Sequence, residues 1–200
     1  MTSQATDFVI ERALIDTLRV KPFEKITIDD IARTAEIDRS TFYRYFHNKY
    51  EALSSSMRVI ITPDMFKELD SMNPSSRLAT MIQWVVHNHK LMKNLLVENQ
   101  QFSSYQELVR VVTTILLELD NNTPNPASNR PLANLIHGAP DPKRLIHFAA
   151  AMIVSVLTDY IANDDKIKAD DVINDIHYLF VKLGLDEDIA ANQASTMRKD

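Results

Sequence analysis

Apolar residues recur along the opening stretch of the chain with the spacing of a helix rather than that of a strand. Positions 10, 13, 14, 17 and 18 carry Ile, Ala, Leu, Thr and Leu, which lie on one face of a helix with 3.6 residues per turn. The pattern predicts a first helix over residues 7–20. Lys21 and Pro22 follow and end it, because proline disfavours the helical conformation of the residue before it.

Three further helices follow closely in the first third of the chain. Thr27 can cap a second helix, because a threonine side chain accepts a hydrogen bond from a free amide of the first turn. Its inner face comprises Ile28, Ile31, Ala32 and Ala35. Asp38 is a candidate cap for a short third helix, and Asn48 for a fourth that runs from 49 toward 60. The sequence therefore predicts two short helices joined by a tight turn.

The rest of the chain has a helical period as well. It predicts helices near 76–89, 90–98, 103–120, 143–163 and 169–183, with Gly184 as the residue after the last helix. The segment 121–142 is rich in Pro and Asn and predicts a long loop, and the polar tail from Asp186 is expected to fray. The predicted fold class is all-α, with a three-helix head at residues 1–50 and a larger helical domain at residues 51–200.

Composition excludes several classes of function. The chain has 200 residues and no cysteine, so it offers no disulfide framework and no thiolate nucleophile. Its two glycines exclude a Gly-rich phosphate-binding loop. We found neither a signal-peptide pattern nor an unbroken apolar run of about 18 residues, so we expect a cytoplasmic protein with no membrane partner.

Charge is distributed unevenly in this acidic chain. The formal net charge is −5, yet residues 39–50 contain Arg39, Arg44 and Lys49 and no Asp or Glu. A helix that enters the major groove of DNA needs an apolar back and a front of hydrogen-bond donors. The third predicted helix has both, although its aromatic residues are equally compatible with ordinary packing. The donors are Arg39, Ser40, Thr41, Tyr43 and Arg44, and the back is Ile37, Phe42 and Phe46.

The run ITIDDIARTAEIDRSTFYRYFHNKYEAL, residues 26–53, resembles the DNA-binding region of the TetR family of bacterial transcriptional regulators. The resemblance implies a homodimer that binds a double-stranded DNA operator, with a repressor expected. Carried over by position, it implies phosphate contacts from Thr27, Thr41, Tyr43, Tyr45 and Lys49. It implies base contacts from Arg39, Ser40 and either Tyr43 or Arg44.

Two positions depart from the pattern of that family. Glu36 stands in the turn where the family often has glycine, so a positive φ there would cost on the order of 1 kcal/mol. Tyr45 replaces a commonly seen histidine, which keeps a polar tip but changes its reach. Neither departure removes the resemblance.

The resemblance also implies that the larger helical block forms the dimer and holds an effector. Residues 147–161 and 172–183 are the predicted dimer helices, with internal core as the alternative. A pocket lined by Met81, Trp84, Met92, Phe102, Tyr105 and Met152 is the candidate effector site, again with plain core as the alternative. The segment 87–102 resembles one found in a subset that includes regulators of dihydroxyacetone kinase operons, so the effector is a small molecule or a protein. The histidines lack ligand spacing, and we assign no metal and no cofactor.

Two other functions compete with a DNA-binding regulator. A protein-interaction module of the same fold would act through a partner protein, and the zero net charge of residues 1–62 favours it. A hydrolase with a Ser, His and Asp triad lacks a nucleophile elbow, because the two glycines are not placed to form one. We therefore expect no enzymatic activity.

Overall fold

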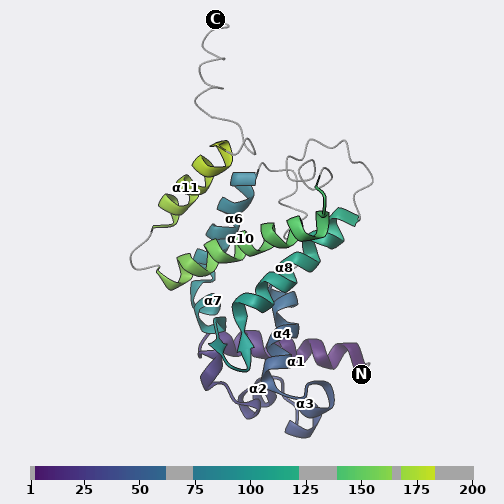
Figure 1. The fold of residues 1–200 in the computed structure, drawn as a ribbon. Helices are drawn as coiled ribbons and strands as arrows, with labels where there is room; N and C mark the ends of the chain where they lie inside the picture. The colour runs from purple at the N-terminus through teal and green to yellow at the C-terminus, as the bar shows by residue number, and fades with distance from the viewer. Residues whose placement is uncertain (1–2, 62–73, 122–138, 164–167, 183–200) are drawn as a thin grey trace, which may run out of the picture.

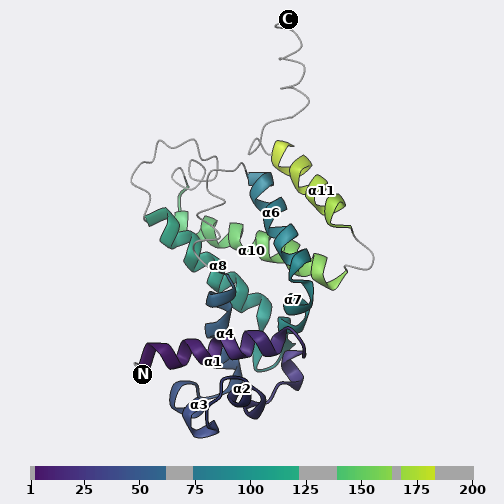
Figure 2. The ribbon, with the colours of Figure 1, turned by 180° about the vertical axis from the view of Figure 1, so that it is seen from behind.

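The computed structural model describes residues 3–61, 74–121, 139–163 and 168–182, and it is built almost wholly of helices (Figure 1). The predicted all-α fold is confirmed. α1, α2 and α3 lie at one end of the molecule, and α6, α10 and α11 lie toward the other (Figures 1 and 2). α4 and α8 connect the two ends.

The opening helices form where their caps and apolar faces predict. α1 spans Ser3–Leu18 and is followed by a 3-10 turn, η1, at Phe23–Lys25. α2 spans Ile28–Thr34, α3 spans Arg39–Tyr45 and α4 spans Lys49–Ile60. The caps at Thr27 and Asn48 are confirmed, since each side chain accepts amide hydrogen bonds from the first turn. Asp38 precedes α3, but its side chain makes no capping hydrogen bond.

The second part of the chain contains five described helices and a short hairpin. α6 spans Pro74–His87, α7 His89–Leu95, α8 Ser104–Asn121, α10 Pro142–Ala162 and α11 Ala169–Lys182. α10 packs along α8, and α11 packs along α6. The predicted loop, apart from its ends, lies outside the described residues, as do Gly184 and the tail.

The hairpin between α7 and α8 was not predicted. β1 (Glu98–Asn99) pairs antiparallel with β2 (Phe102–Ser103), so α7 ends at Leu95 instead of near 98. Ser104 closes the base of this hairpin: its hydroxyl oxygen accepts from the Val97 amide and donates to the Leu95 carbonyl, both at 2.8 Å. Two-residue strands are too short to leave an alternating pattern in a sequence.

A continuous apolar core joins the two ends of the molecule. It begins with Ile10 and Leu14 of α1, passes through Leu53 and Met57 of α4, and reaches Val112 of α8. α4 therefore packs on α1 with one face and on α8 with another. α4 thus belongs to both packing interfaces and joins the opening helices to the larger helical part.

α10 is long and apolar enough to span a membrane by length and composition, with a mean hydropathy of 1.8 over its most apolar window. It is the one such helix among the described residues, and polar residues interrupt its apolar run. Ile146, Ala150 and Val154 are buried against neighbouring helices. Core helices of globular proteins pass the same test, so we infer no membrane contact from it.

Candidate nucleic-acid interface

The turn between α2 and α3 contains the one described non-glycine residue with a positive φ. Glu36 has φ 55°, the left-handed conformation that glycine adopts without cost. The amide of Ile37 donates to the Ala32 carbonyl at 3.0 Å, which closes the end of α2 and turns the chain. The positive φ that would make Glu36 costly is therefore present, and such a conformation costs a non-glycine residue on the order of 1 kcal/mol.

α3 has the two faces that its sequence predicts. Phe42 is fully buried and Phe46, the residue after the helix, is nearly so. The side chains of Arg39, Ser40, Tyr43 and Arg44 are exposed, whereas Thr41 and Tyr45 are half-buried. The guanidinium of Arg44 lies 5.4 Å from the centre of the Tyr45 ring. α3 therefore presents hydrogen-bond donors to solvent at the end of the molecule farthest from α10 (Figure 1).

Arg39 has partners of its own in this structure. Its guanidinium donates to both carboxylate oxygens of Asp29, at 3.2 Å each, and to the hydroxyl of Tyr43 at 3.2 Å. The Tyr43 hydroxyl and then the Asp29 carboxylate raise the pKa of Arg39. Asp29 lies in the first turn of α2, so this exposed ion pair links the two helices. Asp29 and Arg39 are ten residues apart, so no local pattern predicts that an acid binds the first residue of α3.

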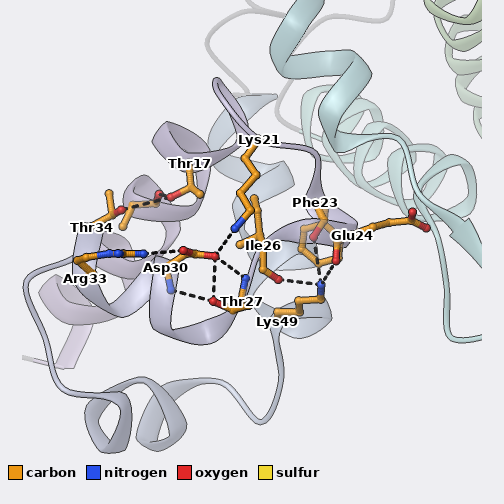
Figure 3. A network of polar contacts seen from close by, with 11 residues as sticks. Thr17, Lys21, Phe23, Glu24, Ile26, Thr27, Asp30, Arg33, Thr34 and Lys49 are labelled. Atoms are coloured by element: carbon orange, nitrogen blue, oxygen red, sulfur yellow. Dashed lines mark hydrogen bonds and ion pairs between the residues drawn. The ribbon is translucent and has the colours of Figure 1, made fainter.

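The start of α2 is held by a network around Asp30 (Figure 3). The Asp30 carboxylate accepts hydrogen bonds from Lys21 at 2.6 Å, from Arg33 at 2.6 Å, and from the amide and hydroxyl of Thr27 at 2.9 and 2.8 Å. The lysine and then the Thr27 donors hold the pKa of Asp30 far below its usual range. The Thr27 hydroxyl thus already donates its proton, although the side chain remains exposed.

Lys49, for which the resemblance implies a phosphate contact, bonds backbone carbonyls of its own chain in this structure. Its ammonium donates to the carbonyls of Phe23 and Glu24 at 3.1 Å each and to that of Ile26 at 2.9 Å (Figure 3). It also lies 4.6 Å from the centre of the Phe23 ring. Burial lowers the pKa of Lys49. The three carbonyls belong to the turn that leads into α2. They lie 23 to 26 residues before Lys49 in the chain.

His47 and Glu51 complete the junction between α3 and α4, although neither was predicted as a site residue. One carboxylate oxygen of Glu51 accepts from the His47 amide at 2.7 Å and lies 2.8 Å from Nδ1 of its ring. The backbone hydrogen bond and then the ring lower the pKa of Glu51. Glu51 three residues after the cap Asn48 is a detectable local signal, because a glutamate there reaches back to the preceding backbone.

An apolar cavity of about 40 Å³ lies among the helices of the larger part. That volume is close to the space of a single water molecule, so a drug-sized ligand would have to expand it. Three of the six predicted effector residues line it, and the other three lie elsewhere. The lining residues are Ile61, Met81, Trp84, Val85, Met92, Leu108, Val112, Val154, Leu157, Thr158 and Ile161.

The three remaining residues have other contacts. Phe102 of β2 packs on the Tyr50 ring of α4, with ring centres 5.7 Å apart. The Tyr105 hydroxyl lies 3.5 Å from the Ala151 carbonyl, and the tyrosine is partly exposed. Met152 is exposed on α10. These three residues therefore do not line the cavity.

Polar contacts also join α4 to α8. Ser54 and Arg110 both donate to the Glu107 carboxylate, and Arg110 lowers the pKa of that carboxyl. One turn further along α4, Arg58 forms an ion pair with Glu118 at 3.1 Å. These contacts add directional links to the apolar contact between the two helices.

The geometry defines a helix-turn-helix head whose second helix presents donors to solvent, mounted on a helical body. Residues 12–54 match the family described as bacterial regulatory proteins, tetR family. Over this region the chain is thus similar to the DNA-binding part of helix-turn-helix regulators of that family.

One relative is similar to part of the chain. The chain is 41% identical over 49 residues to the HTH-type dhaKLM operon transcriptional activator DhaS of Lactococcus lactis subsp. lactis (strain IL1403). That match covers 24% of this chain and 26% of the relative, so the chain matches about a quarter of the relative's length.

Two solved structures share the fold at 14% identity. A TetR transcriptional regulator from Rhodococcus sp. RHA1 has a TM-score of 0.56 over 90% of this chain and 98% of the other. NalD of Pseudomonas aeruginosa, the secondary repressor of the MexAB-OprM multidrug efflux pump, has a TM-score of 0.53 over 90% of this chain and 97% of the other. At this identity the likeness shows the fold alone.

Proposed function

We propose that the protein is a homodimeric regulator that binds a pseudo-palindromic DNA operator through α3, and that an effector controls this binding. The observation that carries the proposal is the exposed face of α3, where Arg39, Ser40, Tyr43 and Arg44 project to solvent with no acid on the same helix. A seven-residue helix with this face matches the depth and chemistry of a major groove.

The donors on and beside α3 divide into two proposed roles. Contacts with base edges fall to Arg39, Ser40 and Arg44. An arginine side chain can donate two hydrogen bonds to guanine, and a serine hydroxyl can form a hydrogen bond with a base edge. Tyr43 serves either a base or a phosphate. Thr41 and Tyr45 are half-buried, and we propose that their hydroxyls bind phosphates and so position the helix. Thr27 remains a candidate phosphate contact, provided that its hydroxyl releases Asp30.

Dimerisation is proposed because one short helix makes too few base contacts for a specific site. We assign residues 1–50 to the DNA-binding domain and residues 51–200 to dimerisation and effector binding, with α4 crossing between them. α10 presents Phe148 and Met152, which are exposed and four residues apart, and α11 presents exposed Tyr178. An apolar strip of this kind suits a twofold interface. Buried Ala150, in contrast, belongs to the core of one subunit.

We propose repression as the direction of control, because a dimer on a promoter blocks polymerase without any additional contact surface. The relative from Lactococcus lactis is an activator, so the opposite direction has a precedent in a protein matched over 49 residues. A promoter fusion in cells with and without the gene decides between them. Higher reporter output in the deletion strain supports repression, and lower output supports activation.

The alternative is a regulator of the same fold that acts through a partner protein. The observation that favours it is that Arg39 is already paired with Asp29, so the reading face is partly neutralised within the chain. A single stoichiometric partner recovered with the protein, together with no affinity for DNA, would favour this alternative.

The test of the proposed function is selection of bound sequences from a random DNA pool at low salt. Two heads about one helical turn apart, near 34 Å, predict an inverted repeat. Arg144→Ala is a matched control, since Arg144 is an exposed arginine of α10 paired with Asp141, and it should select the same repeat. No enrichment by a folded dimer would contradict the proposal.

A further inference from the structure

Lys49 uses its charge inside the protein. An ammonium group has three N–H donors, and the three carbonyls of Phe23, Glu24 and Ile26 all lie within 3.1 Å of it. Lys49 opens α4, whereas the carbonyls belong to the segment that leads into α2. The side chain therefore ties the beginning of α4 to the beginning of α2 (Figure 3).

A row of three aromatic rings connects Lys49 with the hairpin of the larger helical part. The Phe23 ring packs edge-on against Tyr50, with ring centres 5.4 Å apart, and Lys49 lies 4.6 Å from the Phe23 ring centre. Tyr50 also contacts Phe102, at 5.7 Å between ring centres. Phe102 comes from the hairpin, so the row runs from β2 through α4 to the turn before α2.

We propose that Lys49 is a positioning residue for α2 and α3 rather than a phosphate ligand, and that Phe102, through Tyr50, sets the position of this lysine. The inference deepens the proposed function and rests on it wherever DNA affinity is the measure. Ile26 precedes the cap residue Thr27 directly, so a shift of its carbonyl moves the start of α2. α2 packs on α3 and passes the shift to the reading helix.

The alternative role of Lys49 makes a different physical demand. To reach a phosphate, the ammonium would have to leave all three carbonyls, and a half-buried carbonyl without a partner is costly. A phosphate contact would also release a counterion, which steepens the dependence of log K on log salt by about 0.9 per contact. If Lys49 only positions α2, it releases no counterion when the protein binds DNA. The two roles therefore predict different salt dependences for the same variants.

The first experiment compares Lys49→Met and Lys49→Arg in the full-length chain, on the sequence recovered by selection. If Lys49 positions α2, both variants bind about tenfold more weakly, because a planar guanidinium cannot donate to three converging carbonyls as an ammonium does. The salt slope stays at the wild-type value. If Lys49 binds phosphate, Lys49→Arg retains affinity and Lys49→Met lowers the slope by about one per head, which would overturn the inference.

The second experiment tests the link to the hairpin. Phe102→Ala should weaken DNA binding about threefold and speed hydrogen exchange at the Ile26 and Asp30 amides, which are bonded within the tethered segment. Gln100→Ala, an exposed change in the same hairpin, is the matched control and should change neither quantity. In a Lys49→Met background, Phe102→Ala should add no further loss, because both changes act through one contact chain. Fully additive losses would overturn the link.

Hydrogen exchange in the free protein separates failure of this inference from failure of the proposed function. If wild-type protein selects no DNA sequence, the proposed function fails. Faster exchange at Ile26 and Asp30 in Phe102→Ala and Lys49→Met still supports the positioning role, and unchanged exchange in both variants overturns it. Circular dichroism of each variant confirms that the helices are retained.

Discussion

α2 and α3 are both seven residues long and lie at the same end of the molecule, but they use their polar side chains in opposite ways. The polar groups at the start of α2 bond one another: Thr27, Asp30 and Lys21 form a closed network. The polar groups of α3 point mostly to solvent. The polar side chains at the start of α2 therefore stabilise the head, whereas those of α3 are available to bind DNA.

Removal of a reading side chain should have the largest effect. Arg39→Ala should reduce discrimination between the selected site and a site changed at one position per half by about ten- to a hundredfold. Stability should change little, because Arg39 is exposed. Competition binding with single-substitution duplexes measures this. An equal loss on every duplex would show that Arg39 binds the backbone instead.

Breaking the network at α2 should lower stability. Asp30→Asn removes the ion pairs with Lys21 and Arg33 and weakens the cap, which should lower the free energy of unfolding by about 1–2 kcal/mol in urea titrations. Asp16→Asn is the matched control, since Asp16 is exposed and 4.0 Å from Arg19, and it should cost under about 0.5 kcal/mol. Equal losses of stability in Asp30→Asn and Asp16→Asn would show that Asp30 contributes no more than an ordinary exposed carboxylate.

The same network predicts a dependence on pH. The pKa of Asp30 is lower in the folded chain than in the unfolded chain, so its contribution is present above the unfolded value of about 4 and is lost as the pH falls below it. Wild-type protein should therefore lose more stability between about pH 5 and pH 2 than Asp30→Asn does. Parallel losses over that range would show that Asp30 does not contribute.

Relief of strain in the turn should have a smaller effect of opposite sign. Glu36→Gly should raise the free energy of unfolding by about 1 kcal/mol at most, because glycine adopts φ 55° freely but loses more entropy on folding. Glu24→Gly, in the 3-10 turn, is a comparison position without positive φ and should destabilise. Thermal unfolding of the two variants measures the difference. If Glu36→Gly destabilises as much, the turn is not strained.

Release of Arg39 should have the smallest effect. Asp29→Asn removes the acid that pairs with Arg39 and should strengthen DNA binding two- to fivefold at low salt, with less effect at high salt, because exposed ion pairs are weak. Weaker binding by Asp29→Asn would show that the pair orients Arg39 for reading rather than occupying it.

The local features of this fold could be predicted from sequence, whereas contacts between distant residues could not. The apolar period and the caps at Thr27 and Asn48 act within a few residues, so they located the helices well. The carbonyl partners of Lys49 lie 23 to 26 residues away, and no pattern in the sequence indicates that this lysine turns inward. Phe102 likewise is a large aromatic residue of the kind that lines pockets, yet the hairpin places its ring against Tyr50.

The measurement that tests the central claim most directly is the ratio of two dissociation constants for wild-type protein, one for the selected inverted repeat and one for a shuffled duplex of equal length and salt. A regulator that reads sequence through α3 should bind the repeat at least about a thousandfold more tightly. A ratio near one, from protein shown to be folded and dimeric, would contradict sequence-specific reading by this helix.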